Sequence, residues 1–274
     1  MKKLLVAFIL ISNISFSQNF PAYDVNLLLD KEIKVIEKNE NLQKYGYDGF
    51  FKNKGLKKKF NCCESYNSKY AGLVGKVFKV LSAEPYKNRI GVDKYKLKIE
   101  NSEVGIIYFD YNPKYEHSFP FEVIGGLDLP KDFYCKKLKV KKDKFEDKIT
   151  TSTPYASGIS FIKVERNSKE VIYFNINETG STLLINKKGL YLLLENNKRI
   201  SKPNLDIDVE VNTGGSGYIY NAFVKLSKED IELLLNNKIT DDKLYIYEGT
   251  VDKESANKIM GYLKCLVQNN SKNN

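Results

Sequence analysis

The single histidine of the chain, His117, limits the acid–base and nucleophilic chemistry that the protein can perform. A Ser–His–Asp or Cys–His mechanism would have to use this residue, because an imidazole must take the proton from the nucleophile. His117 lies in the short segment Tyr115–Phe119, beside aromatic side chains. A surface or half-packed histidine is the simpler interpretation, so the sequence assigns no catalytic residue.

Three carboxylates, Asp206, Asp208 and Glu210, alternate with apolar residues within Leu205–Val211 and are expected on one face of one strand. Carboxylates in a row could hold calcium, but no Asp-rich loop with the spacing of a calcium site accompanies them. A glycosidase needs two carboxylates that normally come from different strands and face one cleft. A solvated strand face is therefore preferred, and a secreted hydrolase using dispersed carboxylates is the alternative.

Aromatic residues gather on the expected strands and loops between Leu73 and Gly126. Small barrels often present such rings to extended peptides or glycans. Core packing is the usual role of rings on short strands, and it is the competing interpretation here. The predicted ligand-binding residues are Tyr86, Tyr108, Tyr111, Tyr115, His117 and Phe119.

Four cysteines, Cys62, Cys63, Cys135 and Cys265, are disulfide candidates if the protein is exported. The favoured pairing joins Cys135 to Cys265 and leaves a bridge between the adjacent Cys62 and Cys63. The alternative pairs Cys62 or Cys63 with Cys135. A zinc site is not expected, because the spacing is wrong and one histidine is available. No metal and no cofactor are predicted.

The first 17 residues have the pattern of a secretory signal peptide. Lys2 and Lys3 precede the apolar run Leu4–Ile11, which is too short to cross a bilayer, and Ser15–Ser17 supplies small residues for cleavage. We therefore expect a secreted or periplasmic protein, cleaved near Ser17, that is not embedded in the membrane.

A formal net charge of +10 suggests an anionic partner, yet almost all of the positive charge comes from lysine. Arginine, which nucleic-acid readers use for bidentate contacts, occurs only at Arg89, Arg166 and Arg199. The one dense cluster, Lys136–Lys144, alternates with apolar residues and predicts a solvated edge strand. The expected partner is an envelope or extracellular molecule and not a nucleic acid; the oligomeric state is not predicted.

The predicted fold class is mainly β (α+β), with a small Src-homology-3-like barrel over residues 70–127. Its strands are expected at Leu73–Leu81, ended by Ser82–Pro85, at Lys94–Glu100, at Val104–Phe109 and at Phe119–Ile124. Pro120 places the last of these at a strand start or a sheet edge. Residues 18–69 form an arm whose segment Leu28–Ile36 either opens a degenerate first barrel or pairs with the barrel.

Residues 128–268 are predicted to form an antiparallel sheet or sandwich with two helices, before a polar tail at 269–274. Strands are expected from Gly158 onward, and Thr182–Ile185, Leu205–Val211 and Leu244–Tyr247 are among them. Ser227 is a suitable N-cap for a helix over Lys228–Asn236, and an apolar stripe predicts a second helix over 253–267.

Several segments resemble secreted proteins of the Bacteroidota to which no activity is assigned. They are Phe119–Gly125, Gly180–Leu183, Asp208–Val211, Leu244–Tyr247 with the final helix, and the Ser17–Gln18 cleavage site. The resemblance implies the architecture and the location but no catalytic motif. The expected function is a secreted, non-catalytic binding or structural protein for a peptide or a cell-surface glycan. The alternatives are the hydrolase and an inhibitor or immunity-type protein that acts through a sheet edge.

Overall fold

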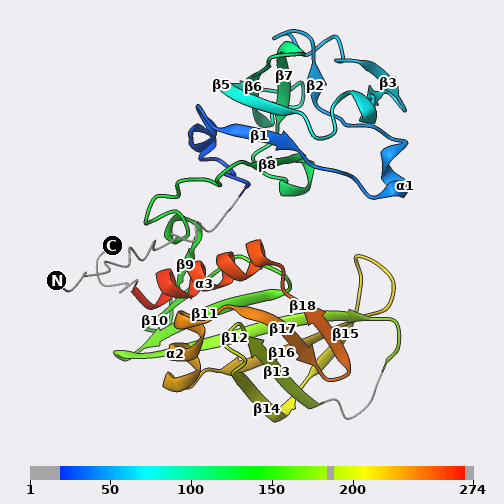
Figure 1. Ribbon diagram of the computed structural model, residues 1–274. Coiled ribbons are helices and arrows are strands. Elements are labelled where there is room, and N and C mark those ends of the chain that lie inside the picture. The colour runs from blue at the N-terminus through cyan, green and yellow to red at the C-terminus, as the bar shows by residue number, and fades with distance from the viewer. Residues whose placement is uncertain (1–18, 184–187, 269–274) are drawn as a thin grey trace, which may run out of the picture. The chain divides into compact units, whose positions relative to one another are not determined.

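The computed structural model describes residues 19–183 and 188–268 (Figure 1). Two compact units divide between Leu129 and Pro130, close to the predicted boundary, and are called unit 1 and unit 2. The predicted signal segment, the predicted polar tail and the end of the expected strand Thr182–Ile185 lie outside the described residues. Within the described ranges, no helix is long and apolar enough to cross a membrane. The fold is mainly β with helices, as predicted.

Unit 1 is built on one six-stranded antiparallel sheet that forms a half-barrel. Its aromatic core includes Phe50, Phe78, Phe109 and Phe121. A short helix, α1 (Glu40–Gln43), and a two-stranded ribbon lie outside this sheet; the ribbon pairs β3 (Cys62–Glu64) with β4 (Asn67–Ser68). The strand order of the sheet is β2 (Phe50–Phe51), β7 (Gly105–Tyr111), β6 (Asp93–Asn101), β5 (Val77–Lys87), β1 (Glu32–Val35) and β8 (Phe121–Val123).

The N-terminal arm is part of this sheet and does not form a first barrel. Strand β1 lies between β5 and β8, where Ile33 is opposite Phe78 on one side and Val123 on the other. All three side chains are buried, so the apolar alternation of the arm completes the core. The boundary expected at residue 69 therefore separates segments that share one sheet.

Strand β5 continues past the predicted breaker at Pro85. Pro85 is opposite Tyr95 of β6, whereas the other neighbour of β5, β1, ends its pairing at Lys79. Proline lacks an N–H donor and is tolerated where one side of the strand has no partner. The prediction that Leu73–Leu81 is the whole strand is wrong for this reason. Pro120, by contrast, precedes the edge strand β8, as predicted.

Unit 2 contains two antiparallel sheets that contribute to one core (Figure 1). The six-stranded sheet has the order β15 (Asp208–Val211), β16 (Tyr218–Lys225), β12 (Lys169–Gly180), β11 (Ile159–Arg166), β10 (Lys148–Ser152) and β9 (Lys139–Lys142). The four-stranded sheet has the order β14 (Arg199–Asp206), β13 (Lys188–Leu194), β17 (Ile239–Leu244) and β18 (Tyr247–Thr250). Strand β9 is the solvated lysine-rich edge that the sequence predicts.

Both helices predicted for unit 2 are confirmed. Helix α2 (Lys228–Asn236) begins with a capping box, in which the Ser227 side chain accepts from the backbone N–H of Asp230. Helix α3 (Lys253–Gln268) packs its apolar stripe against β11 and β17 and also contacts α2. The helices therefore complete the core that the two sheets leave open.

Two expected strands differ from the structure. The run Leu205–Val211 is divided at Ile207: β14 ends at Asp206 in one sheet, and β15 begins at Asp208 in the other. The segment Leu244–Tyr247 is a hairpin turn between β17 and β18, and Tyr245 has a φ of 59° there. Alternation and aromatic content predict an extended chain, but they do not specify the partner strand or the position of the turn.

Disulfides join Cys135 to Cys265 and Cys62 to Cys63. The first fastens the segment that begins unit 2 to α3, with 5.1 Å between the two Cα atoms. Beside it, the ring of Tyr134 packs edge-on against Tyr262 of α3, with the centroids 5.3 Å apart. The bridge and the ring contact hold the same stretch of chain against one helix.

Substitution of Gly261 by alanine should destabilise unit 2, although alanine favours helix more than glycine does. A Cβ at position 261 would lie 2.4 Å from the ring of Tyr134. The overpacking cost of about 1–3 kcal/mol exceeds the helix-propensity gain of about 1 kcal/mol. We expect a net loss of about 1 kcal/mol in denaturant unfolding. A more stable G261A variant would show that Tyr134 moves away without cost.

Candidate ligand-binding site

The structure divides the six predicted ligand-binding residues instead of joining them in one groove. Tyr111 and Phe119 are buried in the core of unit 1, and the Tyr111 hydroxyl donates to the carbonyl of Ala22 at 2.6 Å. Burial raises the pKa of Tyr111 far above its ordinary value. These two rings are therefore core residues, and their assignment as ligand contacts is wrong.

The other four predicted residues are at least partly accessible. Tyr86 and Tyr108 lie on different strands, and the Tyr86 hydroxyl donates to Asp110 Oδ1 at 2.5 Å. Tyr115 and His117 are exposed, their ring centroids are 5.5 Å apart, and both line a cavity of about 240 Å³ in unit 1. The structure thus brings together only two of the six residues at a cavity.

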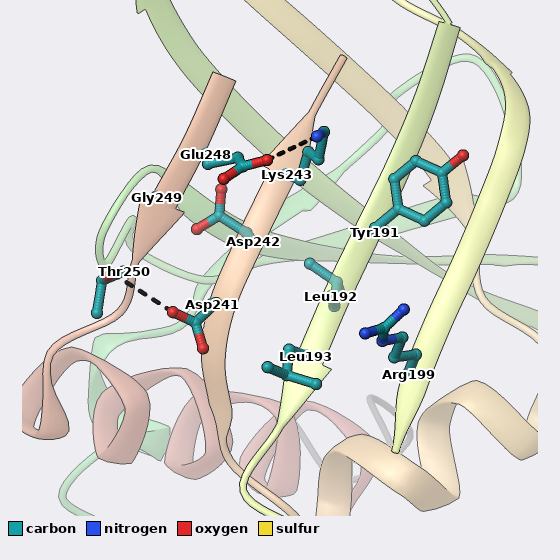
Figure 2. A pocket seen from close by; sticks show the side chains of 10 residues that line it. All are labelled: Tyr191, Leu192, Leu193, Arg199, Asp241, Asp242, Lys243, Glu248, Gly249 and Thr250. Atoms are coloured by element: carbon teal, nitrogen blue, oxygen red, sulfur yellow. Dashed lines mark hydrogen bonds and ion pairs between the residues drawn. The ribbon is translucent and has the colours of Figure 1, made fainter. Parts of the chain in front are cut away.

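A larger hollow, which the sequence did not predict, lies on the four-stranded sheet of unit 2 (Figure 2). Its volume is about 630 Å³. We call it the sheet groove and define it by the side chains that alternate away from the core. They are Tyr191, Leu193, Arg199, Asp241, Lys243 and Glu248.

The antiparallel register arranges these side chains in two rows across the strands. In one row, Lys243 lies between Tyr191 of β13 and Glu248 of β18. In the other, Leu193 lies between Arg199 of β14 and Asp241 of β17. Figure 2 shows the two charged side chains on either side of Leu193. The floor of the groove is therefore an aromatic side chain with a charged residue on one side and an aliphatic side chain with charged residues on both sides.

The charges in the sheet groove differ in how far they are already paired. Lys243 Nζ lies 2.6 Å from Glu248 Oε1, so these two groups largely neutralise one another. Asp241 accepts only a 3.4 Å hydrogen bond from the Thr250 hydroxyl. In the ranges that the structure describes, Arg199 has no ion-pair partner. One guanidinium and one carboxylate are thus available to a ligand.

A carboxyl pair lies on the opposite, inner face of the same sheet. Asp242 of β17 is buried and lies close enough to Glu178 of β12 for each carboxyl to affect the pKa of the other. Burial and the neighbouring Glu178 raise the pKa of Asp242 to about 6, and burial also raises the pKa of Glu178. A Cβ on Gly249 would lie 3.0 Å from Asp242 Oδ1, so glycine leaves room for this pair.

This arrangement does not support glycoside hydrolysis. Asp241 and Asp242 are consecutive on β17 and point to opposite faces, so they cannot flank one bond. Asp242 is buried, so its carboxyl is not open to a sugar. The predicted carboxylates are exposed and divided between sheets, Asp206 on β14 and Asp208 and Glu210 on β15. Among the described residues, no cluster of three or more potential ligands could hold a metal ion.

The sheet groove is not evident from the sequence, because strand β17 contains two aspartates and a lysine, which are not typical of a strand. One signal was present. The run Leu190–Leu194 is apolar at every position, and in an antiparallel sheet this places apolar side chains on both faces. Tyr191 and Leu193 are the outward members.

Comparisons with protein-family models, curated proteins and solved structures found no match to this chain.

Proposed function

We propose that this chain is an exported, non-catalytic binding protein whose sheet groove holds a glycan. The observation that carries the proposal is the groove floor, in which Tyr191 and Leu193 lie beside Arg199 and Asp241, neither of which forms an ion pair within the described residues. Sugars present apolar C–H faces and many hydroxyl groups. An aromatic ring with a guanidinium and a carboxylate complements both features.

The position of the groove favours a glycan over a peptide. Extended peptides gain affinity by adding a strand to a free sheet edge, where backbone N–H and C=O groups are open. The sheet groove lies on a face, and the central strands β13 and β17 already have partners on both sides. Recognition therefore depends on side chains alone, as is common for hydroxyl-rich ligands.

Export is part of the proposal and is supported by two features. The N-terminal segment Met1–Ser17 has the pattern of a signal peptide, and all four cysteines are disulfide-bonded. An oxidising compartment is where such bonds persist. The expected glycan is therefore an envelope or extracellular polymer.

The test is a glycan array followed by calorimetric titration with the oligosaccharide that binds. Tyr191→Ala should weaken binding by about fivefold to thirtyfold, because loss of a stacked ring costs about 1–2 kcal/mol. Arg199→Gln should have a similar effect. Tyr66→Ala and Arg89→Gln are matched controls, since both residues are exposed and lie in unit 1.

Three outcomes would reject the proposal. The first is equal affinity in all four variants, and the second is binding of peptides but of no glycan on the array. The third is hydrolysis of the bound oligosaccharide that stops in Asp241→Asn or Asp242→Asn, which would establish the hydrolase instead. Product analysis by mass spectrometry after prolonged incubation distinguishes this case.

A further inference from the structure

The cavity of about 240 Å³ in unit 1 combines an apolar floor with polar walls. Tyr47, Phe109 and Pro120 contribute apolar surface, and Tyr115 extends it toward the rim. Two lysines, Lys38 and Lys94, and two aspartates, Asp48 and Asp110, line the walls together with Asn112 and His117. This set lies apart in sequence from the sheet groove and is independent of it.

The acceptors in the cavity wall are already used. Asp110 accepts from the Tyr86 hydroxyl at 2.5 Å and pairs with Lys94 Nζ at 2.8 Å, so both of its oxygens are occupied. Partial desolvation acts to raise the pKa of Asp48, but its pairing with Lys59 and a backbone hydrogen bond hold that pKa below the usual range, and the side chain remains exposed. Both carboxylates of the cavity wall therefore already have a lysine partner.

The hydrogen-bond donors of the cavity wall, by contrast, have N–H groups that can still bind a ligand. Lys38 Nζ donates to the carbonyl of Gly46 at 2.5 Å and lies 5.0 Å from the centroid of the Tyr47 ring. An ammonium group has three donors, and in the described part of the chain Lys38 forms no ion pair with a carboxylate. Burial consequently lowers the pKa of Lys38. Asn112 uses its side-chain oxygen for the backbone of Lys114, which leaves its amide N–H₂ for a ligand.

We infer that this cavity binds a small carboxylate with an apolar body, with the carboxylate near Lys38 and the body against Tyr47 and Phe109. A ligand carboxylate supplies the acceptors that the cavity lacks and replaces the water that Lys38 loses on burial. Of the two lysines that line the cavity, Lys94 is paired with Asp110, whereas Lys38 forms no ion pair among the described residues. The apolar floor disfavours a small, fully hydrated anion.

Benzoate and benzamide are suitable probes, because they have nearly the same shape and differ in charge. Both are titrated into the ¹⁵N-labelled full chain and followed by amide chemical shifts. Benzoate should shift the resonances of residues around Asn112 and His117 and should bind at least tenfold more tightly than benzamide. Lys38→Gln should weaken benzoate about tenfold, whereas Lys38→Arg should retain most of the affinity.

Two further variants distinguish a loss of benzoate binding from a loss of folding. Lys34→Gln, on an exposed position of neighbouring β1, is the charge-matched control and should leave benzoate affinity unchanged. His117→Ala removes an exposed wall residue without touching the core and should weaken benzoate. Equal binding of benzoate and benzamide would overturn the inference. So would unchanged benzoate affinity in both K38Q and H117A, or shifts confined to residues outside the cavity.

Discussion

Replacement of both Cys135 and Cys265 by serine should lower the free energy of unfolding of unit 2 by about 4–5 kcal/mol. The two residues are separated by 130 positions, so their bond closes a loop that covers nearly the whole unit. Opening it restores conformational freedom to the unfolded chain, and the cost grows with the logarithm of loop length. A typical domain is stable by about 5–15 kcal/mol, so unit 2 would become marginal.

The second disulfide provides the matched control for this experiment. Cys62 and Cys63 are adjacent, so their bond closes no comparable loop. Cys62→Ser with Cys63→Ser should leave the unfolding of unit 2 unchanged. Hydrogen exchange of helix α3 reports on unit 2 separately from unit 1. A loss below 1 kcal/mol in the Cys135 and Cys265 variant would mean that packing, including the Tyr134 and Tyr262 contact, holds the segment without the bond.

The helices of unit 2 were predictable because their signals are local. The N-cap Ser227 and the first-turn acids fix the start of α2, and the apolar stripe of α3 repeats at helical spacing. Strand β6 was predictable for the same reason, since its alternation from Asp93 to Asn101 needs no knowledge of distant residues. The residues of such segments specify a helix or a strand by themselves, without contacts from distant parts of the sequence.

Strands whose partners are distant were harder to predict. Nothing between Leu205 and Val211 signals that the chain leaves one sheet at Asp206 and enters the other at Asp208. Likewise, the aromatic residues of Leu244–Tyr247 favour a strand, but Tyr245 adopts a positive φ in the turn that lets β18 pair with β17. In both cases the outcome depends on tertiary pairing, which overrides local propensity.

The candidate site was hidden for a related reason. Asp242 is an unfavourable strand residue, and its inward position requires the facing Glu178, which is 64 positions away in the sequence. Asp241 and Lys243 face the sheet groove only because Asp242 faces the core. No pattern within β17 alone could therefore reveal either the strand or the groove.

Asp242→Asn should raise the free energy of unfolding of unit 2 by about 2 kcal/mol at pH 7.5. The folded pKa of Asp242 is about 6, above the ordinary value of 3.8, because burial and the neighbouring Glu178 disfavour its charge, so at pH 7.5 the folded state holds Asp242 as a buried, ionised carboxylate. Asparagine removes one charge and can donate to Glu178. Solvent screening reduces the gain to this value, because Glu178 is partly exposed.

The same pair should make the wild-type protein more stable as the pH falls from 7.5 to 5. A raised folded pKa means that the folded state binds the proton more tightly than the unfolded state does. The resulting stabilisation is fully present below about pH 4 and is lost as the pH rises through 6. The expected gain is about 1 kcal/mol between pH 7.5 and pH 5, or about 2–4 °C in Tm for a chain of this size. Asp230 and Asp252, whose pKa values are lowered, take up protons only at lower pH.

Asp241→Asn is the matched control, since it removes a carboxylate from the neighbouring position on the outer face of β17. This variant should retain the gain in stability on acidification, whereas D242N should abolish it. Tyr247 of β18 does not contribute in this range, because a hydrogen bond with Tyr220 and desolvation raise its pKa to about 12. An unchanged pH profile in D242N would show that the carboxyl pair does not share its proton across the two sheets. If D241N and D242N both lose the gain in stability on acidification to the same extent, the effect comes from the total charge of the sheet. Asp241 points away from Glu178, so its removal should not affect the carboxyl pair itself.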